Sequence, residues 1–231
     1  MSFTRKNDAE RENLKLSVRD LRRNYSYGGL IRSELPKDPM QLFLLWFSLL
    51  NSTDHPDWFE VNAMTLATAN PDGGACSRVV LLKGIEEDGF LFFTNYDSDK
   101  GRQIAAQPAI ALHFFWPMFD RQVRIEGLAM KTSAAVSDQY FASRPRNSQL
   151  GAVASPQSQI LNDDLQLDLA VQELEIKYSG QPVARPQNWG GYKVKPHLME
   201  FWQGKPSRLH DRFRYQLREQ PWVWSIDRLA P

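Results

Sequence analysis

The segment 207–215 reads SRLHDRFRY and concentrates side chains that bind anions. If the segment is a β-strand, alternate side chains point to opposite faces. One face then carries four basic or titratable side chains, those of Arg208, His210, Arg212 and Arg214. Like charges on one face repel one another, and His210 is the residue able to change charge near neutral pH. The pattern therefore predicts an anionic ligand, such as a planar anion clamped at this face.

Two further segments could each hold an anionic group. In SRVVLLKG (77–84), Arg78 and Lys83 bracket an apolar strand, although an edge strand with solvated ends gives the same pattern. In FFTNYDSDKGRQ (92–103), Ser98 can cap a helix whose free N–H groups, together with Lys100, suit a phosphate. Simple capping explains this pattern as well. A phosphate site therefore requires several such elements to converge.

The segment 138–149, DQYFASRPRNSQ, carries a phenol, a guanidinium and a hydroxyl close together. Tyr140 and Arg144 lie four residues apart on a predicted helix, so they share one face. With Ser148 they could satisfy the oxygens of a phosphomonoester. An ordinary surface helix end accounts for the same residues. Further along, Trp202 offers a flat apolar body with one hydrogen-bond donor.

The overall composition excludes several classes of protein. The chain has 231 residues, with 28 Lys and Arg against 27 Asp and Glu, so it lacks the basic excess of general nucleic-acid or membrane-surface binders. Its single cysteine, Cys76, excludes an intrachain disulfide, and no Cys/His cluster has zinc-site spacing, so we expect no metal. The most apolar run, 40–50, is too short to span a bilayer, and no signal-peptide core precedes it. We expect a soluble cytoplasmic protein without membrane or nucleic-acid partners.

Strand-like segments separated by turn signals dominate the chain after residue 60. They are 61–69, 76–83, 89–95, 108–115, 121–131, 197–203, 207–215 and 222–226. Helical patterns occupy four segments, namely 39–51 after an N-cap at Asp38, 98–107, 132–144 and 164–178. Many strands joined by turns, with peripheral helices, predict a β-barrel core. We expect residues 1–36 to form a partly mobile arm and 37–231 to form a single domain.

Nine short motifs occur in order and at compatible spacings along the chain. They are RVVLLK, FFTN, RQVRIEG, YFASRPRNSQLGA, SPQSQ, NWGGYKV, EFWQG, RLHDRF and IDRLAP. The set resembles the pyridoxine/pyridoxamine 5′-phosphate oxidase family over roughly residues 20–231. The resemblance implies an α+β, mainly β fold, the FMN-binding split β-barrel of Greek-key type with peripheral helices.

The same resemblance implies an activity and an assembly. Members of this family bind FMN non-covalently at a homodimer interface. They oxidise pyridoxine 5′-phosphate or pyridoxamine 5′-phosphate to pyridoxal 5′-phosphate. Oxygen is the electron acceptor and gives H2O2, and the amine substrate also releases NH3.

Site residues follow from the resemblance position by position. The FMN-binding residues are expected to be Arg78, Val79, Val80, Leu81, Lys83, Phe93, Thr94, Lys100, Gln122, Gln157, Ser158, Trp202 and Arg212. The substrate-binding residues are expected to be Arg22, Tyr25, Lys83, Tyr140, Arg144, Ser148, Arg208 and His210. Arg208 and His210 form the expected catalytic pair beside the pyridine ring, and some FMN contacts would come from the partner subunit. Arg22 and Tyr25 belong to an arm segment that closes over the substrate.

One position departs from the family pattern. Where the family usually has Ser-Arg-Lys, this chain has Ser98-Asp99-Lys100. Asp99 suits the first turn of a helix, but it is a poor neighbour for a phosphate. The departure bears on the strength of FMN binding, and Arg102 is the nearby residue able to compensate.

Three alternative functions are compatible with parts of the sequence. An enzyme of the same fold with another substrate would not need the Tyr140, Arg144 and Ser148 cluster. A non-catalytic protein that binds FMN or pyridoxal phosphate would not need the ring-side pair Arg208 and His210. A nucleic-acid binder using the basic segment 207–215 is disfavoured by the balanced net charge.

Overall fold

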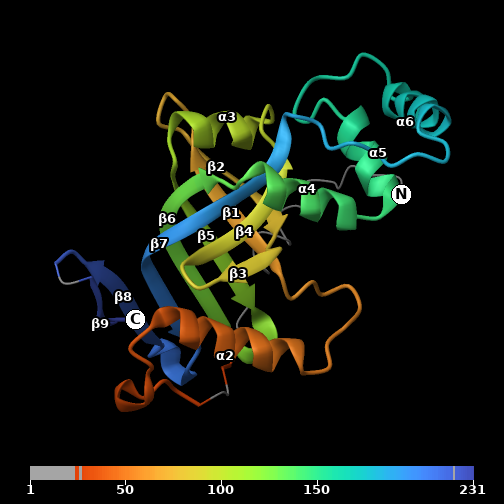
Figure 1. Cartoon of the computed structure of the whole chain (residues 1–231). Helices are drawn as coiled ribbons and strands as arrows, with labels where there is room; N and C mark the ends of the chain where they lie inside the picture. Colours follow the sequence, from red (N-terminus) through yellow and green to blue (C-terminus); the bar gives the residue numbers. More distant parts are fainter. Residues whose placement is uncertain (1–23, 26–27, 221) are drawn as a thin grey trace, which may run out of the picture.

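The computed structural model describes residues 24–25, 28–220 and 222–231. Its centre is a nine-stranded sheet in which the strand order is β2-β1-β5-β6-β7-β4-β3, with β8 and β9 added beside β7. All strand pairs are antiparallel. The sheet curls on itself, and the helices lie around it (Figure 1).

Many of the nine strands alternate between buried and more exposed side chains, as expected for a sheet with one face on a core, whereas β4 is buried along nearly its whole length. In chain order the strands are β1 (Ala63–Ala69), β2 (Ala75–Leu81), β3 (Gly84–Glu86), β4 (Gly89–Asn95), β5 (Ala109–Trp116), β6 (Arg121–Lys131), β7 (Trp189–Gln203), β8 (Asp211–Arg218) and β9 (Val223–Leu229). β1 shows the pattern clearly, because Met64, Leu66 and Thr68 are buried and their neighbours are partly exposed.

β7 is the longest strand and has two different partners along one edge. Its first part pairs with β4, and its last part pairs with β8. Along its other edge, β6 follows it through a register shift between Glu126 and Gly127. A side chain at Gly127 would collide with the backbone of Lys195, so glycine permits this bulge. Bulges of this kind bend a strand and increase its twist, which suits a curled sheet.

The core is capped at one end by α2 (Pro39–Asn51) (Figure 1). Asp38 accepts a hydrogen bond from the Met40 N–H at 2.9 Å and Pro39 occupies the first turn, so the helix starts where its sequence dictates. Phe43 is fully buried and packs edge-on against Phe90 and Phe114. α2 thereby closes one end of the core between the two sides of the sheet.

The other helices lie away from α2. They are α3 (Asp99–Ala106), α4 (Ala134–Ser143), α5 (Arg146–Ala154) and α6 (Gln166–Lys177), and Figure 1 shows them in the upper half of the view, with α2 at the bottom. A second, small hydrophobic cluster consists of Phe141, Leu150, Val183 and Trp189. It attaches α4 and α5 to the beginning of β7. No helix in the described ranges is long and apolar enough to cross a membrane.

The predicted mainly-β architecture with peripheral helices is confirmed, and most element positions are close to those expected. β4 and β6 have the predicted bounds, and α2 ends at the predicted residue. The short β3, the helix α5 and the first part of β7 were not predicted from the sequence.

The prediction that 207–215 is a single strand is wrong. Residues Pro206–Arg208 form a short 3₁₀ turn, Ser207 and Arg208 have φ of +58° and +60°, and β8 begins only at Asp211. Only Arg212 and Arg214 alternate on one strand face, so the four-residue basic face does not form. Asp211, Phe213 and Tyr215 are buried on the other face of β8.

Candidate active site

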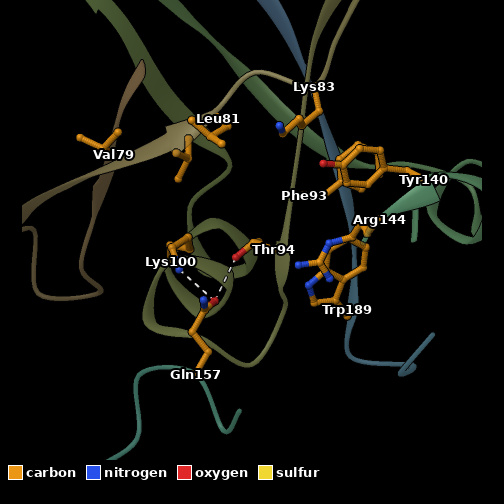
Figure 2. Close-up of a pocket in the computed structure, with 11 residues that line it drawn as sticks. Val79, Leu81, Lys83, Phe93, Thr94, Lys100, Tyr140, Arg144, Gln157 and Trp189 are labelled. Atoms are coloured by element: carbon orange, nitrogen blue, oxygen red, sulfur yellow. Dashed lines mark hydrogen bonds between the residues drawn. The ribbon is translucent and has the colours of Figure 1, made fainter. Parts of the chain in front are cut away.

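A cavity of about 290 Å³ opens between β2, β4, α3 and the α4 end. Figure 2 shows side chains from these elements around one space. Its lining includes ten residues that the sequence analysis predicted for cofactor or substrate, namely Val79, Val80, Leu81, Lys83, Phe93, Thr94, Lys100, Tyr140, Arg144 and Gln157. Residues from distant segments of the chain therefore converge as predicted.

One wall of the cavity is aromatic. The rings of Phe93 and Tyr140 stack with centroids 3.8 Å apart, and Trp189 lies nearly parallel to both. The Arg144 guanidinium lies 4.7 Å from the Trp189 ring centroid (Figure 2). Such stacking fixes the guanidinium by a cation–π contact. The wall therefore offers a flat surface beside a positive charge.

The opposite wall is the start of α3. The Ser98 side chain caps the helix, and the Gln157 Oε1 atom accepts hydrogen bonds from Thr94 Oγ1 and Lys100 Nζ, each at 3.1 Å. Ser158, which has φ of +74°, accepts a hydrogen bond from the Asp99 N–H at 3.2 Å. The N-terminus of α3, the hydroxyl groups of Thr94 and Ser158 and the Lys100 ammonium group thus lie close together at this wall.

Positively charged side chains, among them Lys100 and Arg144, line the cavity, and the described residues neutralise their charge only in part. Burial lowers the pKa of Lys100, and the nearby Arg78 charge lowers it further, while Asp99 opposes the shift. Burial also lowers the pKa of Arg144, and Tyr140 opposes that shift. The Arg144 Nη1 atom is buried and has no hydrogen-bond partner among the described residues. A buried donor without a partner is costly, so the geometry fits an anionic ligand.

Arg78 lies beside this cavity without lining it. Its guanidinium donates to Thr68 Oγ1 at 2.6 Å and to Gln103 Oε1 at 3.0 Å. These neutral acceptors orient the group but leave its charge uncompensated. Arg78 therefore adds to the positive potential around Lys100, as the shift of the Lys100 pKa indicates.

A second cavity of about 330 Å³ adjoins the first, because Arg144, Gln157 and Trp189 line both. Ser148, predicted to bind substrate, lines this second cavity together with Asn95 and residues of α5. Trp189 was not predicted as a site residue, and neither were Gly151 and Ala152 of α5. The motif NWGGYKV contains Trp189, and an aromatic residue directly before two glycines is the sequence feature that could have marked it as a site residue.

A second group of predicted residues lies elsewhere on the same chain. Gln122, Trp202 and Arg212 sit side by side across β6, β7 and β8. The rings of Tyr25 and His210 pack against Trp202, with centroid distances of 5.7 and 4.6 Å. No member of this group lines either cavity. Figure 1 shows β8 and β9 on the opposite side of the molecule from α4 and α5.

The turn before β8 fixes His210. The Lys205 backbone N–H donates to His210 Nδ1 at 3.1 Å, so the neutral ring carries its proton on Nε2. Burial lowers the pKa of His210, and the adjacent Arg208 charge lowers it further. Arg208 is exposed and reaches its position through left-handed backbone at Ser207 and Arg208. A strained turn thus places Arg208 and His210 near each other.

Glu200, which the sequence analysis did not single out, holds Arg212 in place. It is buried, and its two carboxylate oxygens accept from Arg212 Nε and Arg124 Nη2, each at 2.8 Å. Burial alone would raise the pKa of Glu200, but these hydrogen bonds keep it below the ordinary value. An acidic residue in phase with Trp202 and between the apolar Met199 and Phe201 was the available signal.

The departure at Asp99 is compensated locally. The Arg102 guanidinium pairs with the Asp99 carboxylate across one helical turn and also donates to the Asp97 carbonyl. The acidic charge beside Lys100 is therefore partly cancelled. Arg22, predicted to bind substrate, lies outside the described residues.

The geometry agrees with comparisons against known proteins. A family model described as pyridoxamine 5′-phosphate oxidase matches residues 57–178. A second model, described as the pyridoxine 5′-phosphate oxidase C-terminal dimerisation region, matches residues 189–231. The chain belongs to the pyridoxamine 5′-phosphate oxidase family. The second group of site residues on β7 and β8 falls inside the region matched as a dimerisation region.

Curated relatives cover nearly the whole chain. Pyridoxine/pyridoxamine 5′-phosphate oxidases of Pseudomonas paraeruginosa and Acaryochloris marina are each 49% identical over 215 residues, which is 93% of this chain and 99% and 96% of theirs. Among solved structures, PhzG from Burkholderia lata in complex with tetrahydrophenazine-1-carboxylic acid matches with a TM-score of 0.80 and 30% identity, covering 89% of this chain and all of that one.

A more distant structure supports the fold alone. A pyridoxamine 5′-phosphate oxidase-related, FMN-binding protein of Nostoc punctiforme has a TM-score of 0.67 at 18% identity, covering 85% of this chain and all of that one. The split-barrel fold and the family resemblance predicted from the sequence are confirmed.

We predict that His210 titrates below the ordinary histidine value of 6.5, because burial and the Arg208 charge both disfavour its protonated form. The site histidine is then neutral at pH 7. An NMR pH titration, assigned with His210→Gln, measures this pKa. Replacing Arg208 with Gln should raise it, because one cause of the shift is removed. A pKa at or above 6.5 in the unsubstituted protein would contradict the prediction.

Proposed function

We propose that this chain catalyses the FMN-dependent oxidation of pyridoxine 5′-phosphate or pyridoxamine 5′-phosphate to pyridoxal 5′-phosphate. Oxygen accepts the electrons and gives H2O2, and the amine substrate also releases NH3. One observation carries the proposal. Phosphate-binding groups converge around a flat aromatic wall, and a buried Arg144 donor there has no partner among the residues that the structure describes. Membership of the family supplies the reaction that fits this geometry.

The residues present fit FMN. Its phosphate would lie at the start of α3, against Lys100, Thr94 and Ser158, with Arg78 adding charge from behind. Gln157 links Thr94 and Lys100, so it holds both donors in place. The strand residues 79–81 would support the ring system along β2. When bound, FMN supplies the hydride acceptor and the reaction with oxygen.

The substrate phosphate would be held by Lys83, Tyr140, Arg144 and Ser148. Arg144 can direct its unpartnered Nη1 group at a phosphate oxygen, and such charge-assisted bonds are among the strongest in proteins. Burial raises the pKa of Tyr140, with Arg144 opposing the shift, so its hydroxyl stays protonated and donates. The stacked rings of Phe93 and Tyr140 restrict where the pyridine ring can lie.

The site is completed by a second copy of the chain. Gln122, Trp202 and Arg212 line neither cavity of their own chain, and Trp202 and Arg212 lie in the region matched as a dimerisation region. We therefore place FMN at the interface of a homodimer, where this group faces the partner's cavity. Arg208 and His210 would then flank the pyridine ring. His210, neutral with its proton on Nε2, can donate a hydrogen bond there.

Two further assignments belong to the same proposal. Residues 1–36 act as an arm, and residues 37–231 act as one catalytic domain. The enzyme works in the cytoplasm, where thiols such as that of Cys76 stay reduced.

The test is the visible absorption spectrum of the purified protein loaded with FMN, before and after anaerobic addition of pyridoxine 5′-phosphate. We expect the flavin band to bleach, and to recover with stoichiometric peroxide when air is admitted. A flavin band that ignores both phosphorylated substrates contradicts the proposed substrate class. A reaction with the tetrahydrophenazine-1-carboxylic acid bound by PhzG would instead favour that chemistry.

We predict that Lys83→Ala and Arg144→Ala mainly raise the KM for the phosphorylated substrate. Each removes a charge-assisted phosphate contact worth about 1.5–3 kcal/mol, which corresponds to roughly a ten- to hundredfold change. Steady-state kinetics with saturating FMN measure the effect. Arg146→Ala is the control, because the Arg146 guanidinium binds the Gln181 and Tyr178 carbonyls instead of the cavity. An unchanged KM in both test variants refutes the phosphate assignment.

Arg208→Ala is expected to lower kcat far more than it lowers bound FMN. Arg208 lies on the exposed turn beside His210, so its loss leaves the FMN-phosphate residues on α3 untouched. Turnover and FMN content are measured on the same preparation, by oxygen uptake and flavin absorbance. Equal losses of activity and FMN would show that Arg208 supports cofactor binding instead of the reaction.

A further inference from the structure

The start of β8 carries a buried carboxylate that the proposed chemistry does not use. Asp211 is 1% exposed, and the structure gives it partners from three separate segments. Arg228 on β9 donates to Oδ1 at 2.7 Å, and Lys205 in the β7–β8 turn lies 3.3 Å from the carboxylate. The third partner is the Leu30 backbone N–H, which donates to Oδ2 at 2.9 Å across 181 positions of sequence.

The Leu30 contact attaches the segment before α2 to the β7–β8 hairpin. The same segment contains Tyr25, whose ring meets His210 edge-on at 5.2 Å and Trp202 at 5.7 Å. Arg32 adds a hydrogen bond to the Ile226 carbonyl on β9. The approach at Leu30 is close, because a side chain at Gly29 would meet Asp211 Oδ2 well inside van der Waals contact. The close packing of the segment against the Asp211 carboxylate therefore requires glycine at position 29.

We propose that Asp211 is a positioning residue that holds residues 28–30 against the hairpin and thereby sets Tyr25 over His210. Its action on the reaction is indirect, and this part rests on the proposed function. Register pairing with Gln203 fixes the Asp211 backbone, and Arg228 and Lys205 balance the carboxylate charge. Because the carboxylate is fixed by the barrel, the arm segment receives its position from the barrel before any substrate binds.

A simple stabilising role for the Asp211 ion pairs is the competing explanation. The two explanations differ at Gly29, which belongs to the arm and makes no part of the ion pairs. Alanine at this position blocks the approach of the segment at Asp211 Oδ2, while Arg228 keeps its bond to Oδ1. Gly28 is the matched control, since a side chain there meets nothing within 4 Å. Neither glycine has a positive φ, so alanine adds no backbone strain at either position.

The experiment compares Gly29→Ala, Gly28→Ala and Asp211→Asn as FMN-loaded full-length proteins. Hydrogen–deuterium exchange of the peptide covering residues 28–35, read by mass spectrometry without substrate, reports the Leu30 bond directly. We expect exchange roughly tenfold faster in Gly29→Ala and Asp211→Asn, as the loss of one hydrogen bond to a charged group implies, and unchanged exchange in Gly28→Ala. The KM for pyridoxine 5′-phosphate should rise by a similar factor in the first two variants, with FMN content unchanged.

Each outcome decides a separate point. Unchanged exchange in Gly29→Ala overturns the attachment itself. Faster exchange with an unchanged KM shows that the attachment exists but overturns its positioning role. Asp211→Asn serves as an independent check on the carboxylate, and Gly29→Ala keeps the test decisive if the buried substitution prevents folding. If the unsubstituted protein does not oxidise the substrate, the proposed function fails, while the exchange data still decide the attachment.

Discussion

The division of β7 between two partners determines where the functional groups of this chain can lie. Its first part pairs with β4 and carries Trp189 to the cavity, while its last part pairs with β8 and carries Trp202 away from it. Residues predicted for one site therefore fall into two groups on a single chain. In the homodimer that we propose, each site would combine the cavity of one copy with the β7–β8 group of the other, because a symmetric dimer repeats the same contact twice.

Electrostatics explains why the cavity half is built as it is. Lys100 and Arg144 line the same cavity and Arg78 lies beside it, and the neutral acceptors Gln157, Gln103 and Thr68 orient Lys100 and Arg78. Neutral partners fix the geometry of a cation without cancelling its charge. The hairpin half follows the opposite rule, because Glu200 neutralises Arg212 and Asp211 neutralises Arg228. We therefore expect strong anion binding in the cavity, whereas the hairpin mainly contributes to the shape of the site.

Local sequence signals were sufficient for much of the fold and of the cavity. The Asp38 cap and the Ser98 cap located two helices, because capping depends on a few adjacent residues. Lys83, Lys100, Tyr140 and Arg144 could be singled out by residue type and spacing, whereas most other lining residues were predicted through the family resemblance and Trp189 was missed. The helix α5 was missed because Arg146–Ala154 contains a glycine and buries only Leu150, so it shows little amphipathic pattern.

The prediction of a single strand over 207–215 was wrong for a different reason. Its alternating basic residues imitate a strand, but Ser207 and Arg208 adopt left-handed backbone that costs free energy locally. Local propensity gives no sign of this, because the conformation is maintained by distant contacts. The Asp211 partners on β9 and beside α2 are such contacts, and the Lys205 N–H bond to His210 supports the turn from within. The turn that presents Arg208 and His210 therefore depends on tertiary contacts. We propose that the buried Asp211 carboxylate, which follows this turn, also positions Tyr25 relative to the pair.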